Sequence, residues 1–224
     1  PIGMIRTDGR ENFITSILIA SAKEDETPIV PEVCIFFNHM LLRGNRSKKV
    51  QSIHFDAFES ENYPMLAEAG IVIDYNTNAI RPYEPNRKLI NMNDLDNRVM
   101  VLKLFPGITD KIMDACFSID GLRGVVLETY GSGNSPSEAW FMKSLEKAIK
   151  KGLIILNVSQ CNGGRVIQGR YETSKELLAV GVVSGADMTT EAAVTKLMFL
   201  LGQNFTREEI CLKLTQSISG EITA

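Results

Sequence analysis

The residues with the clearest chemical potential form a basic segment at 43–49. It reads Arg-Gly-Asn-Arg-Ser-Lys-Lys, which places four positive charges within seven residues, directly after an apolar run. Charge runs of this kind usually face water, so composition favours a solvated basic turn. The alternative is that Lys48 or Lys49 is buried at a sheet edge, where desolvation and the neighbouring cation lower its pKa enough for base catalysis.

Two glycine-containing loops also follow apolar runs. The loop 130–136 reads Tyr-Gly-Ser-Gly-Asn-Ser-Pro and precedes a predicted helix, so its backbone amides and Asn134 can meet an anionic or amide-bearing ligand. It is not a dinucleotide fingerprint, because Pro136 stands where a glycine is required, and a tight turn that needs its glycines for geometry is the alternative. The loop 159–164 carries Cys161, which has no histidine or acid nearby to activate it. We expect Cys161 to line the core or a pocket.

The rest of the composition excludes several classes of protein. The four cysteines form no Cys-x-x-Cys pair, and the two histidines, His39 and His54, offer no zinc-ligand spacing. No Gly-x-Ser-x-Gly elbow is present, which disfavours a Ser-His-Asp hydrolase. With 24 basic and 27 acidic residues the net charge is −3, and the longest apolar run, 177–183, is too short to cross a bilayer. These features predict a cytoplasmic protein without disulfides, metal or cofactor that binds small molecules or proteins.

The elements that must position these residues fall into two groups. Residues 1–80 contain a predicted helix at 12–22 and predicted strands at 30–37 and 69–75. Residues 81–97 are rich in Asn, Asp, Arg and Pro and form the predicted linker to a second domain, 98–224. The first group is too small to cover both faces of a parallel sheet, so we expect this domain to be incomplete, with upstream sequence, another chain or a dimer mate supplying the rest.

The second domain shows a regular alternation that predicts a parallel sheet with right-handed crossovers. Strands are predicted at 99–105, 124–129 and 153–158, and helices at 109–118 and 137–151. A helix at 189–201 is apolar almost all round, which indicates burial between domains or subunits. Thr206 and Glu209 have the spacing of a capping box at the start of the last helix.

Six segments of the sequence together resemble the bacterial type I (cytoplasmic) L-asparaginases. The matching segments span the chain: Pro1–Asn12, Arg43–Lys49, Glu128–Asn134, Asn157–Cys161, Gly185–Ala192 and Gly220–Thr223. The resemblance implies an α/β fold of two domains with mainly parallel sheets flanked by helices. It further implies an amidohydrolase that converts L-asparagine to L-aspartate and ammonia, with no nucleic-acid or membrane partner.

The resemblance also implies roles for individual residues. The family uses a nucleophilic threonine, a tyrosine, and a relay of a second threonine, an aspartate and a lysine. The relay lysine matches Lys49, and Lys48 occupies the place of the second threonine. Asn134 matches an asparagine that a neighbouring subunit lends to the substrate pocket, which implies a homodimer or homotetramer.

The sequence departs from this family in two respects. The Thr-Gly-Gly-Thr-Ile and Gly-Thr-Asp-Thr-Met motifs, which carry both threonines, are missing from residues 1–224 and are expected upstream of Pro1. Glu128 stands where some of these enzymes have an arginine of a second asparagine pocket, near Tyr130 and Cys161. Two alternatives stay open: an asparaginase-like subunit of a tRNA-dependent amidotransferase, and a non-catalytic anion-binding module using Arg43, Arg46, Lys48 and the Gly131 loop.

Overall fold

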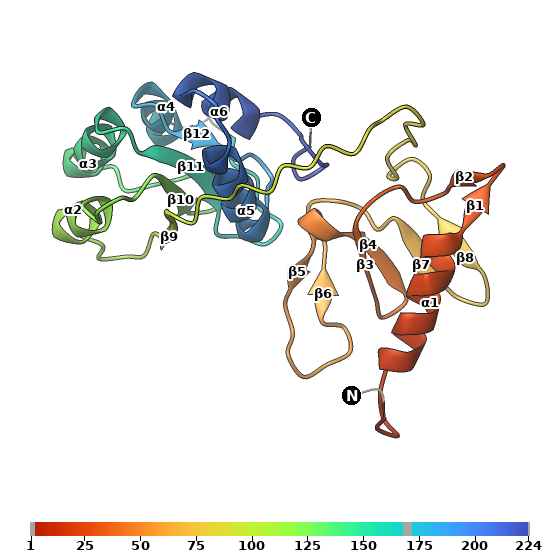
Figure 1. Ribbon diagram of the computed structural model, residues 1–224. Coiled ribbons are helices and arrows are strands. Elements are labelled where there is room, and N and C mark those ends of the chain that lie inside the picture. The colour runs from red at the N-terminus through yellow and green to blue at the C-terminus, as the bar shows by residue number, and fades with distance from the viewer. Residues whose placement is uncertain (1–2, 168–171, 224) are drawn as a thin grey trace. The chain divides into compact units, whose positions relative to one another are not determined.

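The computed structural model describes residues 3–167 and 172–223, and of residues 172–174 only the backbone. The chain divides into two units, Pro1–Ile90 and Asn91–Ala224, each of which is described by itself (Figure 1). The division lies within the predicted linker 81–97, and residues 81–98 form neither helix nor strand.

Unit 1 is built on a four-stranded antiparallel sheet of order β3-β4-β7-β8. Its strands are short: β3 is Cys34–Phe37, β4 Met40–Arg43, β7 Ala67–Ala69 and β8 Ile73–Tyr75. The helix α1, Gly9–Ser21, precedes them, and two small ribbons complete the unit: β1 (Lys23–Glu24) with β2 (Thr27–Pro28), and β5 (Lys48–Lys49) with β6 (Phe58–Glu59).

The expectation of a parallel sheet is wrong for this unit. A parallel pair needs a crossover of about a dozen residues, whereas only Asn38 and His39 separate β3 from β4, so the chain must turn straight back. The single strand expected at 69–75 is also wrong. It is a hairpin, β7 and β8, whose turn is closed by a hydrogen bond from the Gly70 N–H to the Val72 carbonyl (2.8 Å).

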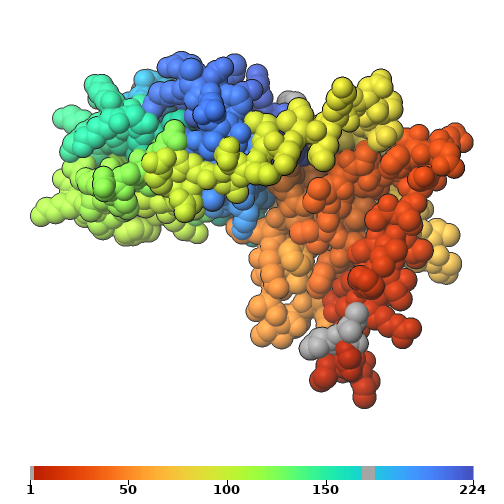
Figure 2. All heavy atoms as spheres, in the orientation of Figure 1, coloured from red at the N-terminus to blue at the C-terminus, as the bar shows by residue number. Residues whose placement is uncertain are grey.

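One face of α1 packs on this sheet and the other does not. Ile19 joins the buried core of the unit with Leu41, Leu66, Ala67 and Ala79. The outward face carries exposed apolar side chains: Phe13, Ile14, Ile17 and Leu18. Figure 2 shows α1, in red, at the surface of its unit. The described residues therefore leave this face of α1 uncovered.

Unit 2 contains the parallel sheet that the alternating pattern predicts. Its order is β12-β11-β10-β9, with all three pairs parallel. The strands are β9 (Val99–Lys103), β10 (Gly124–Thr129), β11 (Ile154–Ser159) and β12 (Val183–Ser184). The helices are α2 (Asp110–Phe117), α3 (Ala139–Lys150), α4 (Glu172–Ala179), α5 (Thr190–Gly202) and α6 (Arg207–Leu214).

Alternate residues of the inner strand β10 face two different apolar cores on opposite sides of the sheet. Val125 and Leu127 pack with residues of α2, α3 and α4, whereas Val126 packs with α5 and α6. Helices thus cover both faces of the sheet, as Figure 1 shows. The capping box at Thr206 is confirmed: its side chain accepts from the Glu209 N–H, and the Glu209 carboxylate accepts from the Thr206 N–H.

The helix expected to be buried, α5, packs on the sheet of its own unit. Leu197 of α5 lies so close to Gly124 of β10 that a Cβ at Gly124 would come within 2.7 Å of it. One of the buried residues of α5 is charged, namely Lys196. The Lys196 Nζ lies 2.7 Å from the Glu221 carboxylate and donates to the carbonyls of Leu214 (3.1 Å) and Gln216 (2.5 Å).

The same ion pair ties down the end of the chain. Glu221 accepts from the amides of Ile218 (3.0 Å) and Ser219 (2.7 Å) as well as from Lys196. Thr223 is held by Asp187, which accepts from its N–H (2.9 Å) and its hydroxyl. The segments 185–192 and 220–223, matched as motifs, are therefore in contact. No helix within residues 3–167 and 172–223 is long and apolar enough to span a membrane.

Candidate functional site

The two arginines of the basic segment turn inward. The Arg43 guanidinium makes a two-point ion pair with the buried Glu32 carboxylate (2.5 and 3.0 Å) and donates to the Ala79 carbonyl (3.1 Å). Arg46 is only 1% exposed, and both guanidinium groups lie over the Tyr63 ring, at 4.1 and 5.1 Å from its centroid. Burial favours the neutral form of Arg43, but hydrogen bonding and attraction from Glu32 outweigh it and raise the pKa of Arg43.

The prediction of a solvated basic turn is therefore wrong for Arg43 and Arg46. For Arg43 the reason is Glu32, whose carboxylate pairs with it and also accepts from the Arg81 N–H (2.7 Å). The turn itself needs Gly44, because a Cβ there would come within 3.0 Å of the Val33 carbonyl oxygen. The sequence shows Glu32 eleven residues before Arg43, but this spacing alone does not predict an ion pair. The β3–β4 hairpin is what brings the two side chains together.

Lys49, the candidate relay residue, lies on the exposed β5–β6 ribbon. It stands opposite Phe58, and its Nζ is 5.7 Å from the centroid of that ring, which packs edge to face on Phe37 (5.3 Å). Lys48 stands opposite Glu59 in the same ribbon. Successive residues of a strand face opposite sides, so the two lysines point apart. The hypothesis of a buried lysine is not supported, because Lys49 is exposed and Lys48 half-buried.

Asn134 lies in a closed loop at the carboxyl end of β10. The Tyr130 N–H donates to the Asn134 carbonyl (2.9 Å), and the Asn134 N–H donates back to the Tyr130 carbonyl (2.8 Å). Gly131 (φ +49°) and Gly133 (φ +108°) supply the left-handed conformations that close the loop. A Cβ at Gly133 would also come within 3.1 Å of Val166. The Asn134 side chain is exposed, as a residue offered to a ligand must be.

The interpretation of this loop as a helix-opening anion site needs correction. The helix α3 begins at Ala139, with Glu138 as its N-cap residue, so it does not open directly behind Asn134. The N–H groups of Gly133 and Asn134 are both engaged by the Tyr130 carbonyl. The alternative interpretation, a tight turn that needs its glycines for geometry, describes the observed backbone.

Polar side chains beneath the loop connect it to the end of β11. Ser159, the last residue of β11, donates its hydroxyl hydrogen to the Gly131 carbonyl (2.6 Å) and accepts from the Cys161 N–H (3.0 Å). Thr129 donates to the Asn157 side-chain oxygen (2.7 Å), and both residues are fully buried. Cys161 is exposed, so it does not lie in the core.

Glu128 lies on β10 close to this loop and is already engaged. Its carboxylate accepts from the Thr190 hydroxyl (2.5 Å) at the start of α5 and lies 3.9 Å from the Lys103 Nζ. Gln160 spans the same strand ends, since its side-chain amide donates to the carbonyls of Leu104 (2.6 Å) and Glu128 (2.9 Å). The carboxyl edge of this sheet, where open parallel sheets bind ligands, therefore carries an acidic side chain held by a hydroxyl and a lysine.

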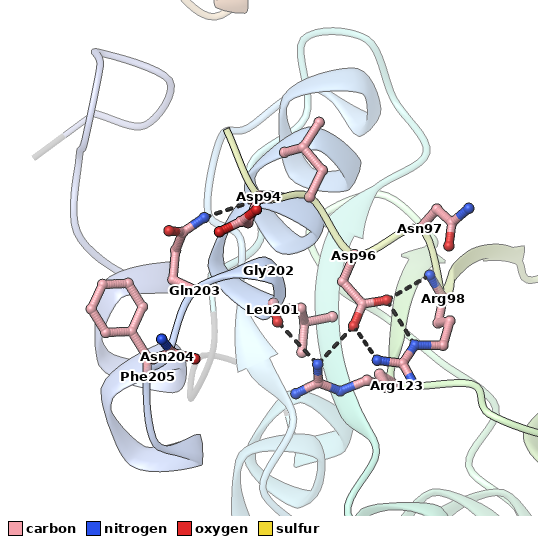
Figure 3. A pocket seen from close by; sticks show the side chains of 11 residues that line it. Asp94, Asp96, Asn97, Arg98, Arg123, Leu201, Gly202, Gln203, Asn204 and Phe205 are labelled. Carbon is pink, nitrogen blue, oxygen red and sulfur yellow. Dashed lines mark hydrogen bonds and ion pairs between the residues drawn. The ribbon is translucent and has the colours of Figure 1, made fainter. Parts of the chain in front are cut away.

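A polar hollow of about 690 Å³ lies at the opposite, amino edge of the sheet. In Figure 3 the Asp96 carboxylate points between the guanidinium groups of Arg98 (2.7 and 2.9 Å) and Arg123 (2.7 Å). The hydrogen bonds from Arg98 hold the pKa of Asp96 well below its usual range. Arg123 also donates to the Leu201 carbonyl (3.0 Å) at the carboxyl end of α5, where the helix dipole favours cations over anions. This network holds the linker to the second unit and is a poor anion site.

The cysteines differ in environment. Burial and the neighbouring Glu32 carboxylate raise the pKa of the Cys34 thiol to about 11. Burial likewise raises the pKa of Cys211. Among the described residues, no three His, Cys, Asp or Glu side chains gather as a metal site would require.

Both domains of one family are recognised in the sequence. Residues 1–81 match the model of the N-terminal asparaginase domain, and residues 98–212 match the glutaminase/asparaginase C-terminal domain. The sequence is 37% identical over 224 residues to the 60 kDa lysophospholipase of Homo sapiens and 35% identical over 223 residues to L-asparaginase 1 of Escherichia coli K12. It is 30% identical over 226 residues to one of the subunits of the glutamyl-tRNA(Gln) amidotransferase of Pyrococcus abyssi.

The comparison with solved structures points to the same family. It superposes on the crystal structure of L-asparaginase I from Vibrio cholerae with a TM-score of 0.91 and 36% sequence identity, covering 100% of this chain and 66% of that one. The chain spans 38% of the length of the human relative, 64% of the Escherichia coli one and 49% of the Pyrococcus one, with 100, 100 and 97% of its own residues matched. An asparaginase-like fold follows for the residues described.

Proposed function

Because the chain belongs to the glutaminase/asparaginase family, we propose that its protein hydrolyses L-asparagine to L-aspartate and ammonia. The relatives named L-asparaginase support this proposal. Lys49 is the catalytic residue that this chain contributes, and Asn134 binds the substrate of a neighbouring subunit in a homodimer or homotetramer. The protein is of the bacterial type I class, and its partner is a small molecule.

The assignment of Lys49 rests on its place in the motif 43–49, and one observation supports it. Within the segment 43–49, folding explains Arg43 and Arg46 through burial and Glu32, and Gly44 through its close approach to Val33. Ser47 donates to the Arg43 carbonyl (2.7 Å) and is equally structural. Lys49 is different, since its ammonium group stands on an exposed ribbon against a single ring. Its exposed ammonium group is therefore free for the relay role that the resemblance to the asparaginases implies.

The proposed chemistry is nucleophilic amide hydrolysis. A threonine hydroxyl attacks the side-chain amide carbon of asparagine, the carbon–nitrogen bond breaks, and the nitrogen leaves as ammonia. In this step Lys49 acts as the neutral amine: it accepts the hydroxyl proton during attack, becomes an ammonium group, and returns a proton to the leaving nitrogen. Water then hydrolyses the ester, which releases aspartate. Residues 1–224 contain neither Thr-Gly-Gly-Thr-Ile nor Gly-Thr-Asp-Thr-Met, and we place the threonine upstream of residue 1.

The test compares the two adjacent lysines in the full-length protein. We expect Lys49→Ala to lower kcat for ammonia release from asparagine by about 100-fold or more, which is the size of general acid–base contributions. Lys48→Ala removes the same charge from the opposite side of the ribbon and should retain most of the activity. Equal losses in the two variants would contradict the assignment of Lys49.

The amidotransferase subunit is the second candidate, favoured by the 30% identity to the Pyrococcus relative. Ammonia release from glutamine that depends on glutamyl-tRNA, without release from asparagine, would support it. The net charge of −3 provides no overall attraction for tRNA. The anion-binding module is not favoured, because Glu32 occupies the Arg43 guanidinium and Arg46 is buried.

A further inference from the structure

We propose that Ser159 is a positioning residue for Asn134. Its hydroxyl joins the loop that carries Asn134 to the turn that follows β11, and so holds in place the backbone from which the Asn134 side chain projects. This inference rests on the proposed function, because it assumes that Asn134 contacts the substrate. It adds a residue on a different strand to the substrate-binding apparatus.

The first argument is the geometry of the hydroxyl. Ser159 is 8% exposed, and its oxygen lies 2.6 Å from the Gly131 carbonyl oxygen and 3.0 Å from the Cys161 nitrogen. A hydroxyl that donates to one loop and accepts from another has a defined orientation, since each bond constrains the other. The turn at 161–164 lies directly on it, because a Cβ at Gly164 would come within 2.0 Å of the Ser159 oxygen.

The second argument is how the loop transmits this constraint. Gly131 is the residue directly after Tyr130, and Tyr130 and Asn134 are joined by two backbone hydrogen bonds (2.8 and 2.9 Å). By holding the Gly131 carbonyl, Ser159 therefore also restrains the closed loop of backbone from Tyr130 to Asn134. On the other side, the Ile167 N–H donates to the Ser132 carbonyl (3.1 Å). Removing the Ser159 hydroxyl would leave the loop attached through its own strand and through this hydrogen bond from Ile167.

The third argument is a buried donor under the loop. Asn157 is fully buried, its oxygen is engaged by Thr129, and its Nδ2 has no hydrogen-bond partner among the described residues. A Cβ at Gly133 would lie 3.8 Å from this Nδ2, so the amide faces the loop. This amide therefore makes no hydrogen bond to the described residues that would hold the loop in place. The Ser159 hydroxyl, in contrast, does make a hydrogen bond from β11 to the loop, at the Gly131 carbonyl (2.6 Å).

The experiment compares three serine variants of the full-length protein. Ser159→Ala removes the hydroxyl, Ser159→Thr keeps it, and Ser144→Ala is the control. Ser144 has a similar burial of 7% in the same unit but lies on α3, away from the loop. The measurements are KM and kcat for asparagine, and hydrogen exchange of the amides of residues 130–134. Thermal melting identifies variants that do not fold.

We expect Ser159→Ala to raise KM roughly tenfold, the size of one hydrogen bond, with kcat within about threefold. Exchange at 130–134 should accelerate by a similar factor, Ser159→Thr should restore both values, and Ser144→Ala should change neither. An unchanged KM for Ser159→Ala in an active enzyme, or unchanged exchange, overturns the inference. A folded Ser159→Thr that behaves like Ser159→Ala also overturns it.

The two proposals fail in different ways. A wild-type protein that releases no ammonia from asparagine overturns the proposed function, and with it the substrate role of Asn134. The exchange measurement needs no activity, and it still decides whether Ser159 holds the loop.

Discussion

The buried pair Lys196–Glu221 allows a quantitative test of what holds the second unit together. Glu221→Gln keeps the shape of the side chain but removes the charge that faces the Lys196 ammonium at 2.7 Å. The two side chains are only 4% and 6% exposed, so water cannot replace the lost carboxylate. Breaking one partner of such a pair costs about 3 kcal/mol or more. In a unit of roughly 130 residues this corresponds to a fall in Tm of roughly 10 °C.

The matched control is the same substitution in an exposed pair. Lys150 and Glu146 are 2.6 Å apart but 71% and 47% exposed, so Glu146→Gln should cost less than about 0.5 kcal/mol. The free energy of unfolding is measured for both variants by urea titration and thermal melting of the full-length protein. Losses within about 1 kcal/mol of each other would refute the argument that burial, and not distance, sets the value.

The pH dependence provides a second check on the same pair. Burial opposes ionisation of Glu221, but the hydrogen bonds from Lys196 and from the Ile218 and Ser219 amides outweigh it, so its pKa is lowered. A carboxyl with a lowered folded-state pKa stabilises the fold above its unfolded pKa of about 4.3, and this stability is lost as the pH falls through the folded value. The difference between wild type and Glu221→Gln should therefore be largest near neutral pH and shrink below about pH 4.

Two further predictions concern the assembly and the thiols. If Asn134 acts across a subunit interface, mixing inactive Lys49→Ala and Asn134→Ala proteins should recover about a quarter of wild-type activity, because half of the exchanged dimers are mixed and each has one intact site of two. Ammonia release that stays at background after verified subunit exchange would show that each site is built within one chain. At pH 8, iodoacetamide should label the exposed Cys161 at least about ten times faster than Cys34, whose pKa is raised to about 11 by burial and Glu32. Peptide mass spectrometry that finds equal rates would contradict the described environment of Cys34.

Local sequence patterns were sufficient to predict most of the helices and strands of the second unit. The strand at 124–129 is predicted at its observed bounds because an apolar run buried on both faces has a characteristic composition, and the alternation with helices implies parallel pairing. The capping box at Thr206 is likewise a contact between residues three apart. Lys49 and Asn134 are found through motifs, which the sequence carries without any folding. The glycines of the loop 130–136 predict a tight turn around Asn134. The contact of this loop with Ser159 cannot be predicted from them.

The sequence by itself therefore determined the family, the parallel α/β unit and the candidate residues, because these depend on neighbours in the chain. The tertiary structure alone decided which charges are structural. Arg43 is turned inward by Glu32, and Lys196 is held by Glu221, twenty-five positions away in the chain. It also decided that the first sheet is antiparallel, since turn lengths and not apolar patterns set strand direction. A buried charge is stable only with its partner, and no local pattern states where in space that partner lies.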